Sequence, residues 1–193
     1  GKAMIALDPM DAGEPIQDPL WSQVGGFSSV QRIAVDEGIV YFVSANTIGA
    51  VNAKTGAPHG GPELHKRLSK IWENPAGKPH HINSIEDGFS AAEGKLYLTF
   101  SDDNLLAQLD ANTGMVVKTF SIKNPGAISA VGDRLVYVTS ESSRVLALDS
   151  TTGKTRVAVD ELTNTDGLAV DRKGNLCLSF GFPKPGLMVY SPD

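Results

Sequence analysis

The feature that most constrains this chain of 193 residues is a segment that recurs along its length. Each copy consists of an apolar run, a turn, a second apolar run and a short polar tag that, in the clear copies, ends in glycine. The first runs stand at residues 40–43, 96–99 and 136–139, and the tags at 52–56, 110–114 and 149–153. A weaker copy begins at Leu176, and part of a still earlier tag survives at residues 5–8. The chain is therefore built from repeats.

The spacing of the repeats predicts their fold. Tyr97, Tyr137 and Cys177 hold the same place in three successive copies, at intervals of about 40 residues, whereas Tyr41 lies one period and one insertion before Tyr97. A period of this length, filled with short alternating strands, is typical of a β-propeller blade. We therefore expect an all-β chain of four-stranded antiparallel blades, with about four blades present as part of a larger ring.

The third copy gives the clearest strand pattern. Its apolar residues alternate, and Gly132-Asp133 forms a hairpin turn. The predicted strands cover residues 127–131, 134–140, 144–149 and 154–159. In the tag, Asp149 is expected to bond its own backbone while Gly153 supplies a positive φ.

The tags divide a single propeller region, residues 1–193, into four blade intervals. These cover residues 9–52, 53–110, 111–149 and 150–191. The second interval holds an insertion at residues 57–83. There Pro62, followed by Leu64, Leu68 and Ile71, predicts a short amphipathic helix.

The end blades of an open set expose an apolar face. We expect this exposure at four residues of the last copy, which are Leu168, Val170, Leu176 and Leu178. Because a blade is stable only when its faces are covered, we expect cover from further chain, from a second copy that completes the ring, or from closure into four blades.

Composition narrows the classes of partner. The net charge of -5 and the pI of about 5.3 argue against nucleic acid, since such binding needs a basic face. No apolar run reaches the roughly 18 residues of a membrane-spanning helix, so direct membrane insertion is not expected. The single cysteine, Cys177, is expected in a strand of the core. It leaves the compartment open, with an extracellular or periplasmic location favoured.

Residues 165–178 resemble the core of an NHL blade, with a Gly-Leu-Ala-Val-Asp strand, a Gly-Asn turn and an apolar strand. The tag at residues 109–114 resembles those of YVTN and PQQ-type propellers. These resemblances imply a propeller with four-stranded blades, and they extend over nearly the whole chain.

The segment around Asp166 is also similar to blades of the senescence-marker and gluconolactonase family. That resemblance implies that Asp166 ligates a divalent metal in the central channel. The family's Asn ligand corresponds to the run Asn124-Pro125-Gly126, in which Pro125 stands in the ligand place and Asn124 is displaced by one. Its Glu ligand is echoed by Glu86, before Asp87 and Gly88.

Loops that enter the innermost strands of a propeller converge at the mouth of its channel. The residues at that place are Gln31, Asp87, Asn124 with Pro125, and Asp166. Asp87, Asp166 and Glu86 could offer oxygen ligands to calcium or another divalent metal, although Asp before Gly also caps ordinary turns. His81, which follows His80, could add an imidazole ligand or an acid–base group, or it belongs to a plain loop.

We expect a propeller module that presents loops around a central channel to a protein or small-molecule ligand. No cofactor is predicted, and the lack of a complete catalytic constellation favours a role other than catalysis. Two alternatives stay open. One is a metal-dependent hydrolase or lyase of the gluconolactonase type, and the other is a sensor or extracellular domain of a larger assembly.

Overall fold

The structure is a computed structural model, and it describes residues 3–6, 21–24, 30–44, 47–59, 88–181 and 184–191. Every regular element in these ranges is a β-strand, as the sequence predicted. The helix expected between Pro62 and Ile71 lies outside the described residues. Among the residues described, none forms a helix that is long and apolar enough to cross a membrane.

The chain forms two compact units, residues 1–81 with 112–114 and residues 82–111 with 115–193. The first unit contains a two-stranded sheet and a three-stranded sheet, both antiparallel. Their strands are β1 (Ala3–Ala6), β2 (Trp21–Val24), β3 (Val30–Asp36), β4 (Ile39–Ser44) and β5 (Thr47–Asn52). Beyond β5, Pro58 makes an isolated antiparallel bridge to Val51.

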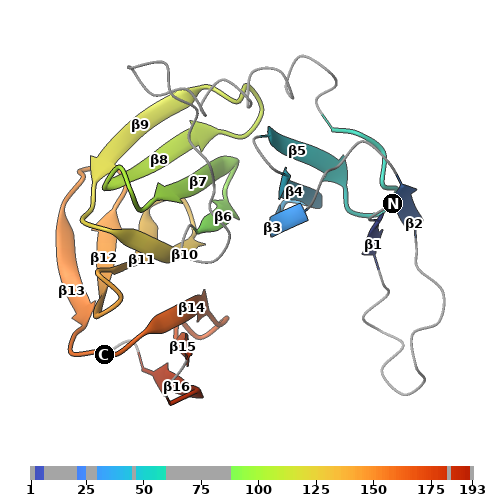
Figure 1. The fold of residues 1–193 in the computed structure, drawn as a ribbon. Coiled ribbons are helices and arrows are strands. Elements are labelled where there is room, and N and C mark those ends of the chain that lie inside the picture. The colour runs from blue at the N-terminus through green and yellow to red at the C-terminus, as the bar shows by residue number, and fades with distance from the viewer. Residues whose placement is uncertain are drawn as a thin grey trace. The chain divides into compact units, whose positions relative to one another are not determined.

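The second unit contains three up-and-down antiparallel sheets (Figure 1). The first two have four strands each, which are β6 (Phe89–Ala92), β7 (Lys95–Phe100), β8 (Leu105–Asp110), β9 (Val116–Ser121), β10 (Pro125–Val131), β11 (Leu135–Ser140), β12 (Arg144–Asp149) and β13 (Thr155–Val159). The third has three described strands, which are β14 (Thr165–Val170), β15 (Leu176–Phe180) and β16 (Gly186–Tyr190). The strands predicted for the third copy are thus confirmed to within two residues.

The innermost strands of these three sheets lie side by side, since β10 contacts both β6 and β14. Apolar side chains fill the spaces between the sheets. The core between β6–β9 and β10–β13 contains Tyr97, Leu106, Phe120, Ile122, Ile128, Val136, Val138 and Leu148. The core between β10–β13 and β14–β16 contains Tyr137, Val145, Ala147, Leu162, Leu176 and Leu178. This face-to-face stacking of antiparallel sheets is the arrangement of propeller blades.

The expectation that Leu168, Val170, Leu176 and Leu178 lack cover was wrong. Leu176 and Leu178 are 5% and 0% exposed and belong to the second core, and Leu168 and Val170 pack against it. Successive strand residues point to opposite faces, and these four share the face that meets β10–β13. Cys177, on the opposite face, is only half-buried.

Hydrogen bonds also join the first two sheets of the second unit, β6–β9 and β10–β13. The hydroxyl of Thr99 on β7 is fully buried and donates to the carbonyl of Gly126 on β10 at 2.8 Å. The same hydroxyl oxygen accepts the N–H of Gly88. Thr139 holds the equivalent place on β11, where its hydroxyl makes one longer bond, 3.4 Å to the carbonyl of Ala127.

We predict that Thr99→Val lowers the free energy of unfolding by about 1 to 3 kcal/mol, because it leaves the buried N–H of Gly88 and the carbonyl of Gly126 without this partner. Thr139→Val is the matched control and should cost less than about 1 kcal/mol, since it removes one weak bond. Chemical denaturation of both variants measures the difference. Equal losses would show that the contact between the sheets does not depend on the Thr99 hydroxyl.

The polar tags form the predicted turns. The Asp149 carboxylate accepts the N–H groups of Thr151 and Thr152 at 2.9 and 3.0 Å, and Gly153 has a φ of 75°. The other carboxylate oxygen of Asp149 accepts hydrogen bonds from the guanidinium of Arg134, at 2.9 Å from Nε and 2.5 Å from Nη2. This ion pair, together with the backbone N–H donors, holds the pKa of Asp149 far below its usual range.

We predict a pH-dependent effect of Asp149→Asn. The depressed pKa of the folded state makes the carboxylate stabilising above its unfolded pKa of about 3.9, and that contribution is lost as the pH falls further. The variant, whose amide can still cap the turn, should therefore melt at a lower temperature than the wild type at neutral pH. The difference in melting temperature should narrow below about pH 4. Thermal melts across this range, with Asp102→Asn in an exposed turn as control, test the expectation. A gap that is constant with pH would contradict it.

Candidate functional site

A β-bulge recurs near the start of three innermost strands. The register against the next strand shifts by one residue between Val30 and Arg32, between Pro125 and Ile128, and between Thr165 and Gly167. Gln31 and Asp166 are the extra residues of β3 and β14. Bulges re-aim side chains and are common beside functional sites. Gln31 and Asp166 are two of the residues that the sequence analysis named as candidates at the channel mouth.

The structure describes only part of the predicted channel-mouth set. Asp166 is exposed, and its carboxylate lies against the backbone of Gly181, where a Cβ would collide with it. Gln31 belongs to the first unit, and its side-chain oxygen is buried with no hydrogen-bond partner in the described residues. His81, Glu86 and Asp87 lie outside the described residues, so the metal site stays a prediction. No three His, Cys, Asp or Glu side chains converge within the ranges that the structure describes.

Asn124 serves the turn before β10. It has a positive φ of 41°, and its N–H donates to the side-chain oxygen of Asn104 at 2.7 Å. Its counterpart is Asn164, with a φ of 49°, because each lies directly before the first paired residue of its strand. By this register Gly126, and not Pro125 or Asn124, takes the place that Asp166 holds in the next sheet.

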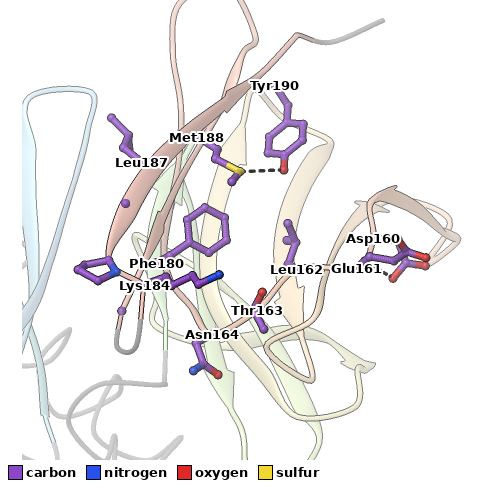
Figure 2. A pocket seen from close by; sticks show the side chains of 13 residues that line it. Asp160, Glu161, Leu162, Thr163, Asn164, Phe180, Lys184, Leu187, Met188 and Tyr190 are labelled. Atoms are coloured by element: carbon purple, nitrogen blue, oxygen red, sulfur yellow. Dashed lines mark hydrogen bonds between the residues drawn. The ribbon is translucent and has the colours of Figure 1, made fainter.

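A pocket of about 540 Å³ opens at a different place, between the β13–β14 connection and strands β15 and β16. Figure 2 shows the side chains of Phe180, Met188 and Tyr190 facing Leu162 across it. The hydroxyl of Tyr190 donates to the sulfur of Met188 at 3.4 Å. The sequence analysis missed this pocket. The available signal was the run at residues 187–189, three large apolar residues with no charge among them.

One wall of the pocket is part of the fold. Leu162 is buried in the second core, and its N–H donates to the carbonyl of Ser143 at 2.7 Å. Ile122 makes the equivalent bond to Asn104 after β9. The stretch that leads from the outer strand to Leu162 is one residue longer than its counterpart before Ile122. It holds Asp160 and Glu161 at the place where the counterpart holds only Ser121. This longer connection forms the polar rim of the pocket, with a positive φ of 58° at Glu161.

The charges around the pocket are mixed. Asp160 lies 3.6 Å from the Nε of Arg144, and its carboxylate accepts the N–H of Glu161 at 2.9 Å. Glu161 is exposed on the same wall, and Lys184 is exposed on the opposite one. The pocket thus combines an apolar floor with two carboxylates and one ammonium group at its rim, which suits an apolar group that carries a charge or lies next to one.

We predict that the two walls differ in their effect on stability. Leu162→Ala should lower the free energy of unfolding by about 2 to 4 kcal/mol, because it opens a cavity in the second core. Leu187 lines the same pocket from an exposed position, so Leu187→Ala should change the free energy of unfolding by less than about 0.5 kcal/mol. Denaturant titrations of the two variants check this. A large loss for Leu187→Ala would mean that the open wall is needed for folding.

The stacked antiparallel sheets define a β-propeller protein. The family of the outer membrane protein assembly factor BamB matches residues 66–170, and the chain belongs to this family. The NHL and YVTN likenesses of single segments stay interpretations of the sequence. No curated protein matches the chain.

Solved structures agree on the fold. A chain of a mitotic checkpoint complex is 13% identical, with a TM-score of 0.62 over 91% of this chain and 52% of its own. A hydrazine synthase chain of Kuenenia stuttgartiensis is 9% identical, with a TM-score of 0.61 over 86% and 46%. The computationally designed protein Ika4 is 15% identical, with a TM-score of 0.58 over 91% and 99%. This chain therefore spans about half the length of the first two, and at such identities the likeness concerns the fold alone.

Proposed function

We propose that this protein is an interaction module that binds a polypeptide partner at the sheet β14–β16. The observation that carries the proposal is the exposure of three consecutive large apolar residues on β16. Leu187, Met188 and Val189 are 71%, 53% and 59% exposed. This exposure extends over both faces of β16, because successive residues of a strand point to opposite faces. Exposed apolar side chains beside a pocket are typical of surfaces that bind another protein.

The equivalent strands of the neighbouring sheets are covered. On β8, Leu106 and Leu109 are fully buried, and on β12 so are Val145 and Leu148. These strands stand third in their sheets, as β16 does. Covering three such side chains on β16 would contribute about 1.5 to 3 kcal/mol for each one that is fully buried, a favourable contribution that opposes the ordering cost of association.

The family supports the same class of function. Its name-giving protein is an assembly factor for outer membrane proteins, and one structural relative is part of a mitotic checkpoint complex. The first name describes a factor for the assembly of other proteins, and the second describes a complex. The alternative of a sensor or extracellular domain is the case in which such a partner belongs to a larger assembly.

The metal-dependent hydrolase or lyase remains the rival, and the bulge that presents Asp166 is the observation that favours it. Calcium and zinc titrations by calorimetry separate the two. Metal binding that is lost in a folded Asp166→Ala variant, together with hydrolysis of a lactone or ester, would overturn the interaction proposal as the primary function.

We predict that a photo-crosslinking amino acid in place of Met188 forms a polypeptide adduct in the source cells, and that the same group in place of Met115 does not. Met115 is the matched control because it is similarly exposed, at 64%, and lies directly before β9, away from the residues that line the pocket. The purified adduct partner should bind the purified protein, and Met188→Glu should weaken that binding at least tenfold, or about 1.4 kcal/mol. Equal labelling from both positions would contradict the proposal.

A further inference from the structure

We infer that the β11–β12 turn, residues 141–143, opens and closes within the folded protein, and that its opening couples the connection that leads into β10 to the connection that leads into β14. The turn is held in a strained backbone conformation, and it is hydrogen-bonded to both connections. This coupling lies at the end of the sheets where β10 and β14 begin, and it does not depend on the partner proposed above.

The turn holds two consecutive residues in the left-handed region of the backbone. Glu141 and Ser142 have φ values of 54° and 53°, and the N–H of Ser143 donates to the carbonyl of Ser140 at 3.2 Å. This is the hydrogen bond of a tight turn with both central residues at positive φ, a type that strongly favours asparagine, aspartate and glycine. Neither central residue here is one of these. Because the left-handed region is unfavourable for other residues that carry a Cβ, the closed turn is strained.

The corresponding turn of the preceding sheet does not carry this strain. Residues 101–104 join β7 to β8, and among them only Asn104 has a positive φ, of 53°. Asparagine tolerates this conformation better than most residues with a side chain. The strain is therefore a property of residues 141–143 and not a requirement of the repeat.

Backbone hydrogen bonds join the turn to the connections on both sides. The N–H of Glu141 donates to the carbonyl of Asn124, directly before β10, at 3.1 Å. The carbonyl of Ser143 accepts the N–H of Leu162, on the connection from β13 to β14, at 2.7 Å. The turn therefore lies between the segments that lead into two innermost strands, the second of which carries Asp166.

The same two kinds of bond recur beyond these connections. The N–H of Ile122 donates to the carbonyl of Asn104 at 3.1 Å, and the N–H of Gly181 donates to the carbonyl of Asn164 at 3.2 Å. Turns and connections thus alternate along one end of the three sheets, each joined to the next by a backbone hydrogen bond. The strained member of such a series opens most easily, and its opening releases the connection on either side.

An ion pair favours the closed turn. The ammonium group of Lys123 lies 2.5 Å from the carboxylate of Glu141, and this contact holds the pKa of Glu141 below its usual range. The Lys123 and Glu141 side chains are 75% and 36% exposed. A pair that is this exposed is screened by salt and stabilises only weakly, so it favours the closed turn without locking it.

Amide hydrogen exchange, measured by NMR on the full-length protein and corrected for intrinsic rates, tests the inference. In the wild type, the N–H groups of Glu141 and Leu162 should exchange at least about tenfold faster than the N–H of Val138, in the middle of β11. Ser142→Gly should slow both by about threefold to tenfold, because relief of the left-handed strain exceeds the entropic cost of glycine. Lys123→Gln should speed both by about twofold.

The matched control is Asp102→Gly in the preceding turn, since Asp102 is exposed and its φ is not positive. It should leave exchange at Glu141 and Leu162 unchanged, and circular dichroism should show that all variants fold. Exchange at Glu141 as slow as at Val138 would overturn the inference, because the turn would then open only when the whole unit unfolds. A response of Glu141 without Leu162 would disprove the coupling. Faster or unchanged exchange in Ser142→Gly would show that the turn is not strained.

Discussion

The structure depends on middle strands that are apolar on both faces. Leu96, Tyr97 and Leu98 are consecutive on β7, and all three are fully buried. Consecutive residues of a strand point to opposite faces, so no single sheet can shield them and each sheet needs a neighbour on either side. Hydrogen bonds hold the strands of one sheet together, while apolar contact, helped by the Thr99 hydroxyl, holds one sheet to the next. Among the described residues this requirement is unmet on β16 and also on β3, where Ile33 and Val35 are each 60% exposed.

Much of the fold follows from the sequence because its signals are local. Alternation marked the strands of the third copy, and Gly132 and the tag ending at Gly153, both with positive φ, marked turns that only a few residue types form readily. Burial of Tyr97 and Tyr137 at the same place in successive copies follows from the same period. These features need no knowledge of what lies on the other side of a sheet.

The candidate site could not be predicted in the same way. Alternation shows that β15 has two faces, but it does not show which face meets the preceding sheet, and Leu178 was therefore assigned to the wrong environment. The pairing of β10 places Gly126, and not Pro125, at the position of Asp166, because β10 and β14 carry the same bulge at the same point. The pocket depends on a contact between Leu162 and β16, which are distant in the chain.

The extra residue in the β13–β14 connection has a consequence for how such a protein can acquire new specificity. Leu162 and Ile122 keep the same backbone bond and the same buried role although their connections differ in length. The sheets thus tolerate length changes between outer and inner strands without a change in their own pairing. Each connection can therefore change independently of the others. The same fold can then carry several pockets whose rims differ in charge and depth, while the packing between the sheets is kept.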